Sequence, residues 1–380
     1  MKNKVSALYL GFNRSYTNPT AEIILKILGS TINLSFYGPG FSKKSELDLG
    51  LDNWIDSQKN FDFIIVDTYV FEADTIIQRH KPFLGDHIRF ETRDFKKYSL
   101  NYRKFFINSN LKKILISNWD TYSISKETID LLIESGTYIL DAAGNTLSDS
   151  IENIKNNYGS HVSGNDNWFN FSLNHKHKFI SCPHVISSSE FDFTPLNNRK
   201  YPFTIIGASY PERKQAFKIL PTNLKISRFL YRLGESLRYR TSSKMSFKFL
   251  LNLRNNYLEL ISNSILCYCS GGPWLYPVRK YFEIPARGAV PVGWYCTGFE
   301  NLGFKNEKNF IIAKTNKDIL DISTKYSMDE LQSIAFASRD LVWKKHSDWA
   351  RATQLSKSFE LILHNNFNGS YWENGNYKHY

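Results

Sequence analysis

The sequence contains no long apolar run and few cysteines. No stretch of its 380 residues approaches the roughly 20 consecutive apolar residues that a helix needs to cross a bilayer. The 4 cysteines include no Cys-x-x-Cys pair, so we do not expect a disulfide framework in a chain of this length. The apolar run Val5–Leu10 near the start is short and is followed by no small-residue cleavage site, which favours a first strand over a secretory signal. We expect a cytoplasmic protein.

Several signatures of nucleotide and metal chemistry are also missing. The chain has no Walker A loop, no Gly-x-Gly-x-x-Gly after the first apolar run, and no His-Glu-x-x-His, which argues against those nucleotide and zinc sites. One cluster has side chains that zinc accepts: His175-x-His177, followed by Cys182-x-His184. The segment between these pairs is typical of a plain strand and lies near a domain boundary. The sequence therefore predicts no metal site.

The composition is that of a folded protein with a basic surface. Apolar residues make up 42% of the chain and aromatic residues 15%, which is ample for buried sheets, and the length favours two domains. The formal net charge of +12 calls for anionic partners, such as nucleic acid, an anionic membrane surface or a nucleotide diphosphate.

The basic residues concentrate in one segment, which carries a single acidic residue, Glu235. Aromatic and leucine residues interleave with the basic ones, so the segment is compatible with a surface that docks on lipid headgroups at the inner face of the membrane. Ordinary helices with solvated Lys and Arg side chains on their outer faces would have the same pattern. We favour this second interpretation. The basic residues are Lys225, Arg228, Arg232, Arg238, Arg240, Lys244, Lys248 and Arg254.

Short apolar runs alternate with helical patterns along the chain. The runs at Phe61–Asp67 and Lys113–Ser117 have continuous apolar centres, 63–66 and 114–116, as in strands buried on both faces of a parallel sheet. The alternation restarts near residue 200, after a polar link over 187–202. We therefore predict an α/β chain with a first Rossmann-like domain over 1–190 and a second over 200–345. Residues 365–380 have little to bury and are predicted to be mobile.

The most informative segment is Val278–Val292. A predicted helix carries Arg279 and Lys280 in its first turn and Glu283 one turn later, and it ends at a Gly before a short apolar strand. Such a helix start suits a diphosphate, and the carboxylate could accept hydrogen bonds from a ribose. An ordinary helix with a Gly cap and a buried strand would have the same pattern.

Two further elements carry phosphate-binding features. At the start of the second domain, an apolar strand runs through Gly207 and Ser209 into a helix with Arg213 in its first turn, which lets backbone N–H groups and a guanidinium meet a phosphate. Later, the apolar run Ser264–Cys269 is followed by Gly271 and Gly272, which allow the backbone to approach a ligand closely.

These elements together resemble a known family. The segment Val278–Val292 resembles the donor-binding signature of GT-B glycosyltransferases, and Gly207–Arg213 resembles the opening of the second domain in bacterial CgeB-like and group 1 glycosyltransferases. The segment His346–Arg351 resembles a C-terminal motif of the same families, with one residue inserted before Trp349. The absence of Asp-x-Asp argues against the metal-dependent GT-A class.

The resemblance implies two Rossmann-like, doubly wound domains facing a cleft, with residues 346–364 crossing back onto the first domain. It assigns Glu283 to the ribose of a nucleotide-diphosphate sugar and Arg279 or Lys280 to its diphosphate, with no metal ion or other cofactor. In retaining members another Glu lies eight positions before the ribose Glu, and this chain has Leu275 there. The stereochemical outcome therefore stays open.

The first domain offers candidates for catalysis and acceptor binding. Gly11 and Arg14 lie in the loop after the first strand and could approach the donor phosphate or the acceptor. An inverting enzyme needs a general base, for which Asp67 and Asp120 at predicted strand ends are candidates. An Asp in such a place is also a common helix N-cap, so each has a structural alternative.

The predicted function is transfer of a sugar from a nucleotide-diphosphate donor to a glycan or lipid-linked acceptor in surface polysaccharide (lipopolysaccharide, O-antigen or capsule) assembly. A GT-B-like sugar-binding protein without catalysis is the first alternative, because of Leu275. A basic nucleic-acid-binding protein is a less favoured one, because no recognition module accompanies the charge.

Overall fold

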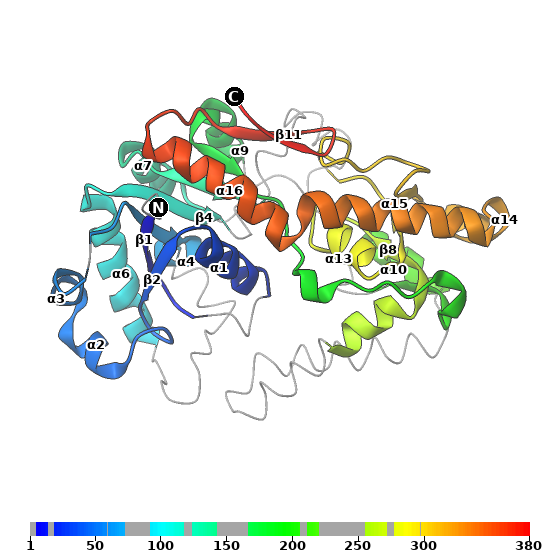
Figure 1. The fold of residues 1–380 in the computed structure, drawn as a ribbon, viewed down its shortest axis with the longest axis horizontal. Coiled ribbons are helices and arrows are strands. Elements are labelled where there is room, and N and C mark those ends of the chain that lie inside the picture. The colour runs from blue at the N-terminus through cyan, green and yellow to red at the C-terminus, as the bar shows by residue number, and fades with distance from the viewer. Residues whose placement is uncertain are drawn as a thin grey trace.

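The computed structural model describes residues 5–13, 19–58, 60–72, 92–117, 124–142, 166–205, 211–219, 255–271, 277–296 and 298–380. Within them lie a six-stranded and a four-stranded parallel sheet, each the centre of one α/β unit. Figure 1 shows the first unit at the left and the second at the right. The prediction of two doubly wound α/β units is confirmed.

The six-stranded sheet of the first unit has the order β2-β1-β3-β4-β5-β6. The order reverses after β2, so the carboxyl ends of β1 and β3 lie side by side at the switch point where such sheets bind ligands. The strands are β1 (Ser6–Leu10), β2 (Asn33–Tyr37), β3 (Phe63–Asp67), β4 (Lys112–Ser117), β5 (Tyr138–Asp141) and β6 (Phe179–Ser181).

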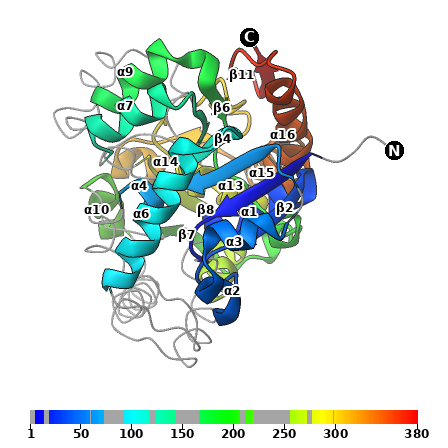
Figure 2. The same ribbon diagram turned by 90° about the vertical axis from the view of Figure 1, so that its left-hand side faces the viewer.

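Alternate residues of these strands serve two separate cores. On β3, Ile64 and Val66 face one core while Phe63 and Ile65 face the other, which explains the unbroken apolar run. The first core is covered by α2 (Lys44–Leu49), α3 (Leu51–Asp56), α4 (Thr68–Phe71), α6 (Thr92–Asn108), α7 (Lys126–Glu134) and α9 (Asp166–Asn174), and the second by α1 (Pro19–Thr31) and α16 (Asp348–Leu363). In Figure 2, α6 and α16 lie on opposite sides of the sheet.

The four-stranded sheet of the second unit has the order β10-β9-β8-β7. Its strands are β7 (Tyr201–Ile205), β8 (Ser264–Cys269), β9 (Val290–Gly293) and β10 (Ile311–Ile312). One face packs against α13 (Lys280–Ala286), and the other packs against α14 (Asn316–Lys325) and the first half of α15 (Met328–His346). A short helix, α10 (Pro211–Ala216), follows β7, and residues 255–262 form a helix that precedes β8.

The C-terminal segment returns to the first unit. α16 begins after Ser347, whose hydroxyl accepts a hydrogen bond from the Ala350 N–H, and its Phe359 packs edge to face on Phe63 of β3. Figure 1 shows α15 and α16 running in succession across the two units.

The prediction that residues 365–380 are mobile is wrong. They form an antiparallel hairpin of β11 (Ser370–Glu373) and β12 (Asn376–His379), in which the Trp372 side chain is buried. The hairpin is held on both sides. The Ser181 N–H of β6 donates to the Ser370 hydroxyl, and the Gly375 N–H donates to the Asn301 carbonyl in the second unit. Burial of Trp372 stabilises the hairpin by apolar packing, which the polar composition of this segment does not lead one to expect.

Three expectations about local features have different outcomes. The donor-signature helix begins at Lys280, so Arg279 is its N-cap residue and not, as predicted, a residue of its first turn. No helix in the described part of the chain is both long and apolar enough to cross a membrane. The basic segment 225–254 lies outside the described residues.

Candidate functional site

The side chains of Arg279 and Glu283 form an ion pair across one turn of α13. Arg279 Nε donates to Glu283 Oε1 over 3.1 Å, and both side chains are largely buried. Arg279 also pairs with Glu190 of the connecting segment, residues 182–200 between β6 and β7, and donates from Nη1 to the Val185 carbonyl over 3.2 Å. The guanidinium therefore joins α13 to the connecting segment.

Glu283 is held as a carboxylate. Burial alone would raise its pKa, but Arg279, Lys280 and a hydrogen bond donated by the Tyr257 hydroxyl outweigh it and hold the pKa below the ordinary value. A carboxylate has about four acceptor positions, and Tyr257 and Arg279 occupy two of them. The remaining capacity is what a pair of ribose hydroxyls would need.

Arg213 and Lys280 converge on the carboxyl end of β8. Arg213 is buried and donates from Nε to the Ser270 hydroxyl over 3.2 Å and from Nη2 to the Ser270 carbonyl over 3.0 Å. Burial raises the pKa of the Cys269 thiol at the end of β8, while the charges of Arg213 and Lys280 oppose that rise. Gly271, also buried, follows directly. The edge is thus rich in cationic and small residues.

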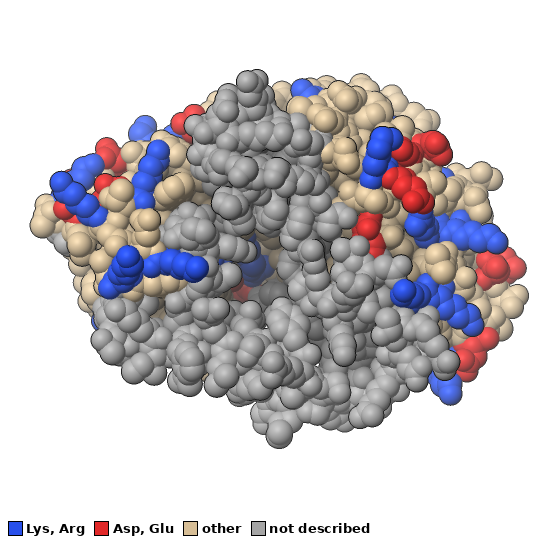
Figure 3. All heavy atoms as spheres, turned by 180° about the vertical axis from the view of Figure 1, so that it is seen from behind, with Lys and Arg blue, Asp and Glu red and all other residues tan. Residues whose placement is uncertain are grey.

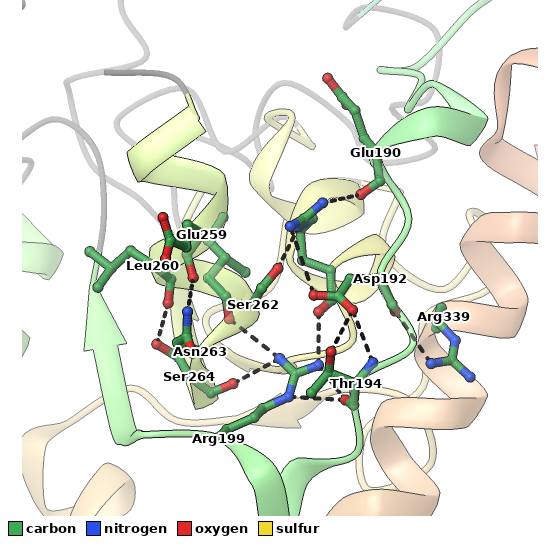
Figure 4. Close-up of polar contacts among 12 residues, drawn as sticks. Glu190, Asp192, Thr194, Arg199, Glu259, Leu260, Ser262, Asn263, Ser264 and Arg339 are labelled. Atoms are coloured by element: carbon green, nitrogen blue, oxygen red, sulfur yellow. Dashed lines mark hydrogen bonds and ion pairs between the residues drawn. The ribbon is translucent and has the colours of Figure 1, made fainter. Parts of the chain in front are cut away.

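A second set of polar contacts fixes the connecting segment to the second unit (Figure 4). Arg199 donates to the carbonyls of Thr194, Ser264 and Arg287 over 2.8 to 3.0 Å, and no carboxylate of the described residues lies at hydrogen-bond distance from it. Figure 4 also shows the Glu190 side chain pointing away from these residues, while its carbonyl accepts from Arg287 Nη1 over 2.9 Å. The Glu190 carboxylate is thereby directed to the Arg279 side of the segment.

His184 lies where the first unit meets the candidate site. Its Nδ1 is 3.5 Å from the hydroxyl of Thr20, at the start of α1. Burial and the charges of Arg279 and Lys280 lower the pKa of His184 to about 3, while Glu283 opposes them, so the imidazole is neutral at pH 7. Among the described residues, no group of three or more His, Cys, Asp and Glu side chains is placed to hold a metal ion.

The carboxyl edge of the first sheet brings two loops together. The Gly11 N–H donates to the Tyr37 carbonyl over 3.2 Å, and Asn13 bonds to the turn after β2 through its backbone and its side chain. Gly38 in that turn has φ +135° and approaches the Gly11 carbonyl so closely that a Cβ would collide with it. Gly11 is therefore a packed element of the loop.

Asp67 is the N-cap residue of α4, the structural alternative that the sequence analysis gave beside the general base. Its Oδ1 accepts from the Tyr69 N–H over 2.9 Å and caps α4, and its Oδ2 accepts from the Tyr9 hydroxyl over 2.9 Å. Both oxygens of this buried carboxylate have protein partners. The geometry favours the N-cap interpretation over the general base.

The C-terminal motif lies at the joint between α15 and α16, where His346, Ser347 and Arg351 are buried while Trp349 is exposed. The ring of His346 lies between aromatic residues, and its Nε2 is 2.9 Å from the Leu302 carbonyl. The Ile186 N–H donates to the His346 carbonyl over 3.2 Å, and the Asp348 N–H donates to the Ile186 carbonyl over 3.0 Å. The motif thus holds the connecting segment through backbone hydrogen bonds.

The structure brings Arg213, Gly271, Arg279, Lys280 and Glu283 to one edge of the second sheet, and places Gly11 and Asp67 at the corresponding edge of the first. Arg14, Asp120, Gly207, Ser209 and Gly272 lie outside the described residues.

The sequence analysis did not identify Glu190 or Tyr257 as site residues, and it considered His184 only as a metal ligand. Glu190 lies in the polar stretch that the sequence analysis interprets as a linker between the domains, and its partner Arg279 is 89 positions away. No local pattern signals such a pair.

Comparison with family models finds no match, and comparison with curated proteins finds none. Among solved structures, a glycosyltransferase from Rickettsia africae aligns with a TM-score of 0.51 and 12% identity, over 96% of this chain and 100% of that one. A sucrose-phosphate synthase from Thermosynechococcus elongatus aligns at 0.49 and 8%, over 95% and 100%. HepE from Anabaena, in complex with UDP and glucose, aligns at 0.45 and 9%, over 94% and 99%. The chain therefore has the GT-B fold.

Proposed function

We propose that this chain is a glycosyltransferase that moves a sugar from a nucleotide-diphosphate donor to a glycan or lipid-linked acceptor in surface polysaccharide assembly. The fold supports a nucleotide-sugar-using protein, and the three family-like segments support the transferase within that fold. A lipid-linked acceptor would bring the enzyme to the inner face of the membrane, for which the basic segment 225–254 is suited.

The observation that carries this proposal is the Arg279–Glu283 ion pair at the start of α13, with the Arg213 guanidinium bonded to Ser270 directly after β8. We assign Glu283 to the donor ribose, because its carboxylate can accept more hydrogen bonds than the two that it accepts from the described residues. We assign Lys280, Arg213 and Arg279 to the diphosphate. These three cations would stabilise the charge that develops on the leaving nucleotide diphosphate. In metal-dependent enzymes a divalent ion has this role.

The sugar would pass from the diphosphate oxygen to an acceptor hydroxyl, whose proton must leave as the new bond forms. The capped geometry of Asp67 leaves Asp120 as the preferred base from the sequence. The edge of the first sheet around Gly11 would then face the acceptor and the transferred sugar.

The test is direct binding of UDP and GDP to the full chain, measured by calorimetry with uridine and guanosine as controls that lack phosphate. We expect one diphosphate to bind with a Kd in the micromolar range and the Glu283→Gln variant to bind it at least about tenfold more weakly. Gln keeps the shape of Glu283, so thermal unfolding of the variant serves as the folding control. Unchanged diphosphate affinity in a folded variant would reject the site assignment.

Leu275 favours a second candidate, a donor-binding protein without catalysis, because retaining relatives place a Glu at that position. The two candidates differ in turnover. Release of free nucleotide diphosphate from a UDP- or GDP-sugar, with or without acceptor, would support the transferase. Tight binding with no release over a long incubation would support the second candidate.

A further inference from the structure

The Glu190 carboxylate pairs with the Arg279 guanidinium, which the proposed function assigns to the donor diphosphate. Arg279 is paired at once with Glu190 from the connecting segment and with Glu283 from its own helix. The side chains of Arg279 and Glu190 are only 12% and 11% exposed, so water screens this pair weakly. Burial lowers the pKa of Arg279, but the two carboxylates raise it above its ordinary value, so the guanidinium stays charged.

Two carboxylates share the guanidinium of Arg279: Glu190 from the connecting segment and Glu283 from α13. A donor diphosphate that binds Arg279 brings about two negative charges to the same guanidinium, and like charges brought close together in a buried site repel strongly. The carboxylate that is held less firmly is therefore the one expected to leave when the diphosphate arrives. Glu283 lies within α13, whereas Glu190 lies at the end of a single 3-10 turn in the connecting segment, η4 (Ser188–Glu190).

We propose that Glu190 is an internal competitor of the donor diphosphate: it pairs with Arg279 when no donor is bound, and donor binding breaks the Arg279–Glu190 pair. This inference rests on the proposed function, because it takes the diphosphate to be the ligand of Arg279. The ion pair then links occupancy of the site to the connecting segment.

The connecting segment links the Arg279–Glu190 pair to the α15–α16 joint between the units. Four residues before Glu190, Ile186 exchanges two backbone hydrogen bonds with His346 and Asp348, where α15 ends and α16 begins. The same segment holds His184 against Thr20 of the first unit. Release of Glu190 from Arg279 would loosen the attachment of this segment to α13 and leave its attachment to the α15–α16 joint in place. Donor binding is thus coupled to the segment through which the units are joined.

Asp192 offers a matched control two positions away. It is also an acidic residue of the connecting segment, but its carboxylate lies 3.8 Å from Arg287 and accepts from the Thr194 N–H and hydroxyl. Asp192→Asn removes the same formal charge as Glu190→Gln and keeps an acceptor for Thr194. Any general effect of net charge on anion binding will appear equally in both variants.

The experiment measures the binding of UDP and GDP, with uridine and guanosine as probes lacking phosphate, to the unaltered chain, Glu190→Gln and Asp192→Asn. We expect Glu190→Gln to bind the diphosphate about threefold to tenfold more tightly, with nucleoside affinity unchanged and Asp192→Asn like the unaltered chain. Equal or weaker diphosphate binding by Glu190→Gln, beside measurable binding by the unaltered chain, overturns this inference and leaves the proposed function standing. Failure of all three proteins to bind either diphosphate overturns both.

Discussion

The imidazole of His346 stacks on the indole of Trp372, with ring centroids 4.6 Å apart and an interplanar angle of 30°. The guanidinium of Arg351 lies over the same indole at 4.9 Å, so Trp372 joins the C-terminal hairpin to the α15–α16 joint. We predict that Trp372→Ala lowers the free energy of unfolding by about 3 to 5 kcal/mol, through lost burial and a cavity at the joint.

Tyr371, the neighbouring residue on β11, is the control for this change. It is only partly buried and stacks on Tyr380 near the end of the chain, away from the His346 ring. Tyr371→Ala should cost about 1 kcal/mol or less. Urea unfolding of both variants measures the difference, and equal losses would show that the hairpin is not anchored through Trp372.

Arg199 is a buried guanidinium that serves backbone carbonyls rather than a carboxylate. It satisfies carbonyls of the connecting segment, of β8 and of the turn after α13, and burial lowers its pKa to about 10. Arg199→Met would leave these buried carbonyls without donors, so we predict a loss of about 2 to 4 kcal/mol in unfolding free energy. Arg339→Met is the control, since Arg339 makes a single 3.4 Å bond to the Asp192 carbonyl at the edge of the same set (Figure 4). A loss of similar size in both variants would contradict the special role of Arg199.

His346 should make the stability of the chain depend on pH. Burial and the neighbouring Arg351 lower its pKa to about 3, whereas in the unfolded chain the pKa is near 6.5. Between these values the unfolded state binds one more proton than the folded state, so stability rises with pH and is lost as the pH falls below about 6.5. We predict that His346 contributes about 1 kcal/mol per pH unit to the slope of unfolding free energy between pH 5 and 6.

The measurement is urea unfolding at several pH values for the unaltered chain and for His346→Gln. The variant is expected to be less stable at every pH but to show the shallower slope. An unchanged slope in His346→Gln would mean that the buried imidazole takes up its proton without unfolding.

Local patterns in the sequence predict the fold and part of the candidate site. The apolar run of β3 indicates a strand covered on both faces, and the four-residue spacing of Arg279 and Glu283 places their side chains together on α13. Both follow from the geometry of a single element. The pairing of Arg279 with Glu190 does not, because it depends on how the connecting segment folds back over the second unit.

The hairpin at the end of the chain is missed for a related reason. Residues 365–380 are rich in Asn and Gly, and their two strands are only four residues long. Their stability comes from distant partners: Trp372 packs on His346, and the Tyr377 hydroxyl bonds to Ser358 of α16. A short polar hairpin gains its order from such tertiary contacts rather than from its own propensity.

The last prediction concerns divalent metal ions. If Lys280 and its neighbouring cations take the place of a metal at the donor diphosphate, affinity for the diphosphate should be the same in EDTA as in magnesium chloride. Lys280→Met should weaken diphosphate binding about tenfold, because a charge-assisted contact contributes about 1.5 to 3 kcal/mol, while nucleoside binding stays unchanged. Lys308→Met, at an exposed position elsewhere in the second unit, removes the same charge and should change neither affinity. Calorimetry in both buffers measures these effects. Diphosphate binding that disappears in EDTA and returns with magnesium would instead assign the charge neutralisation to a metal ion.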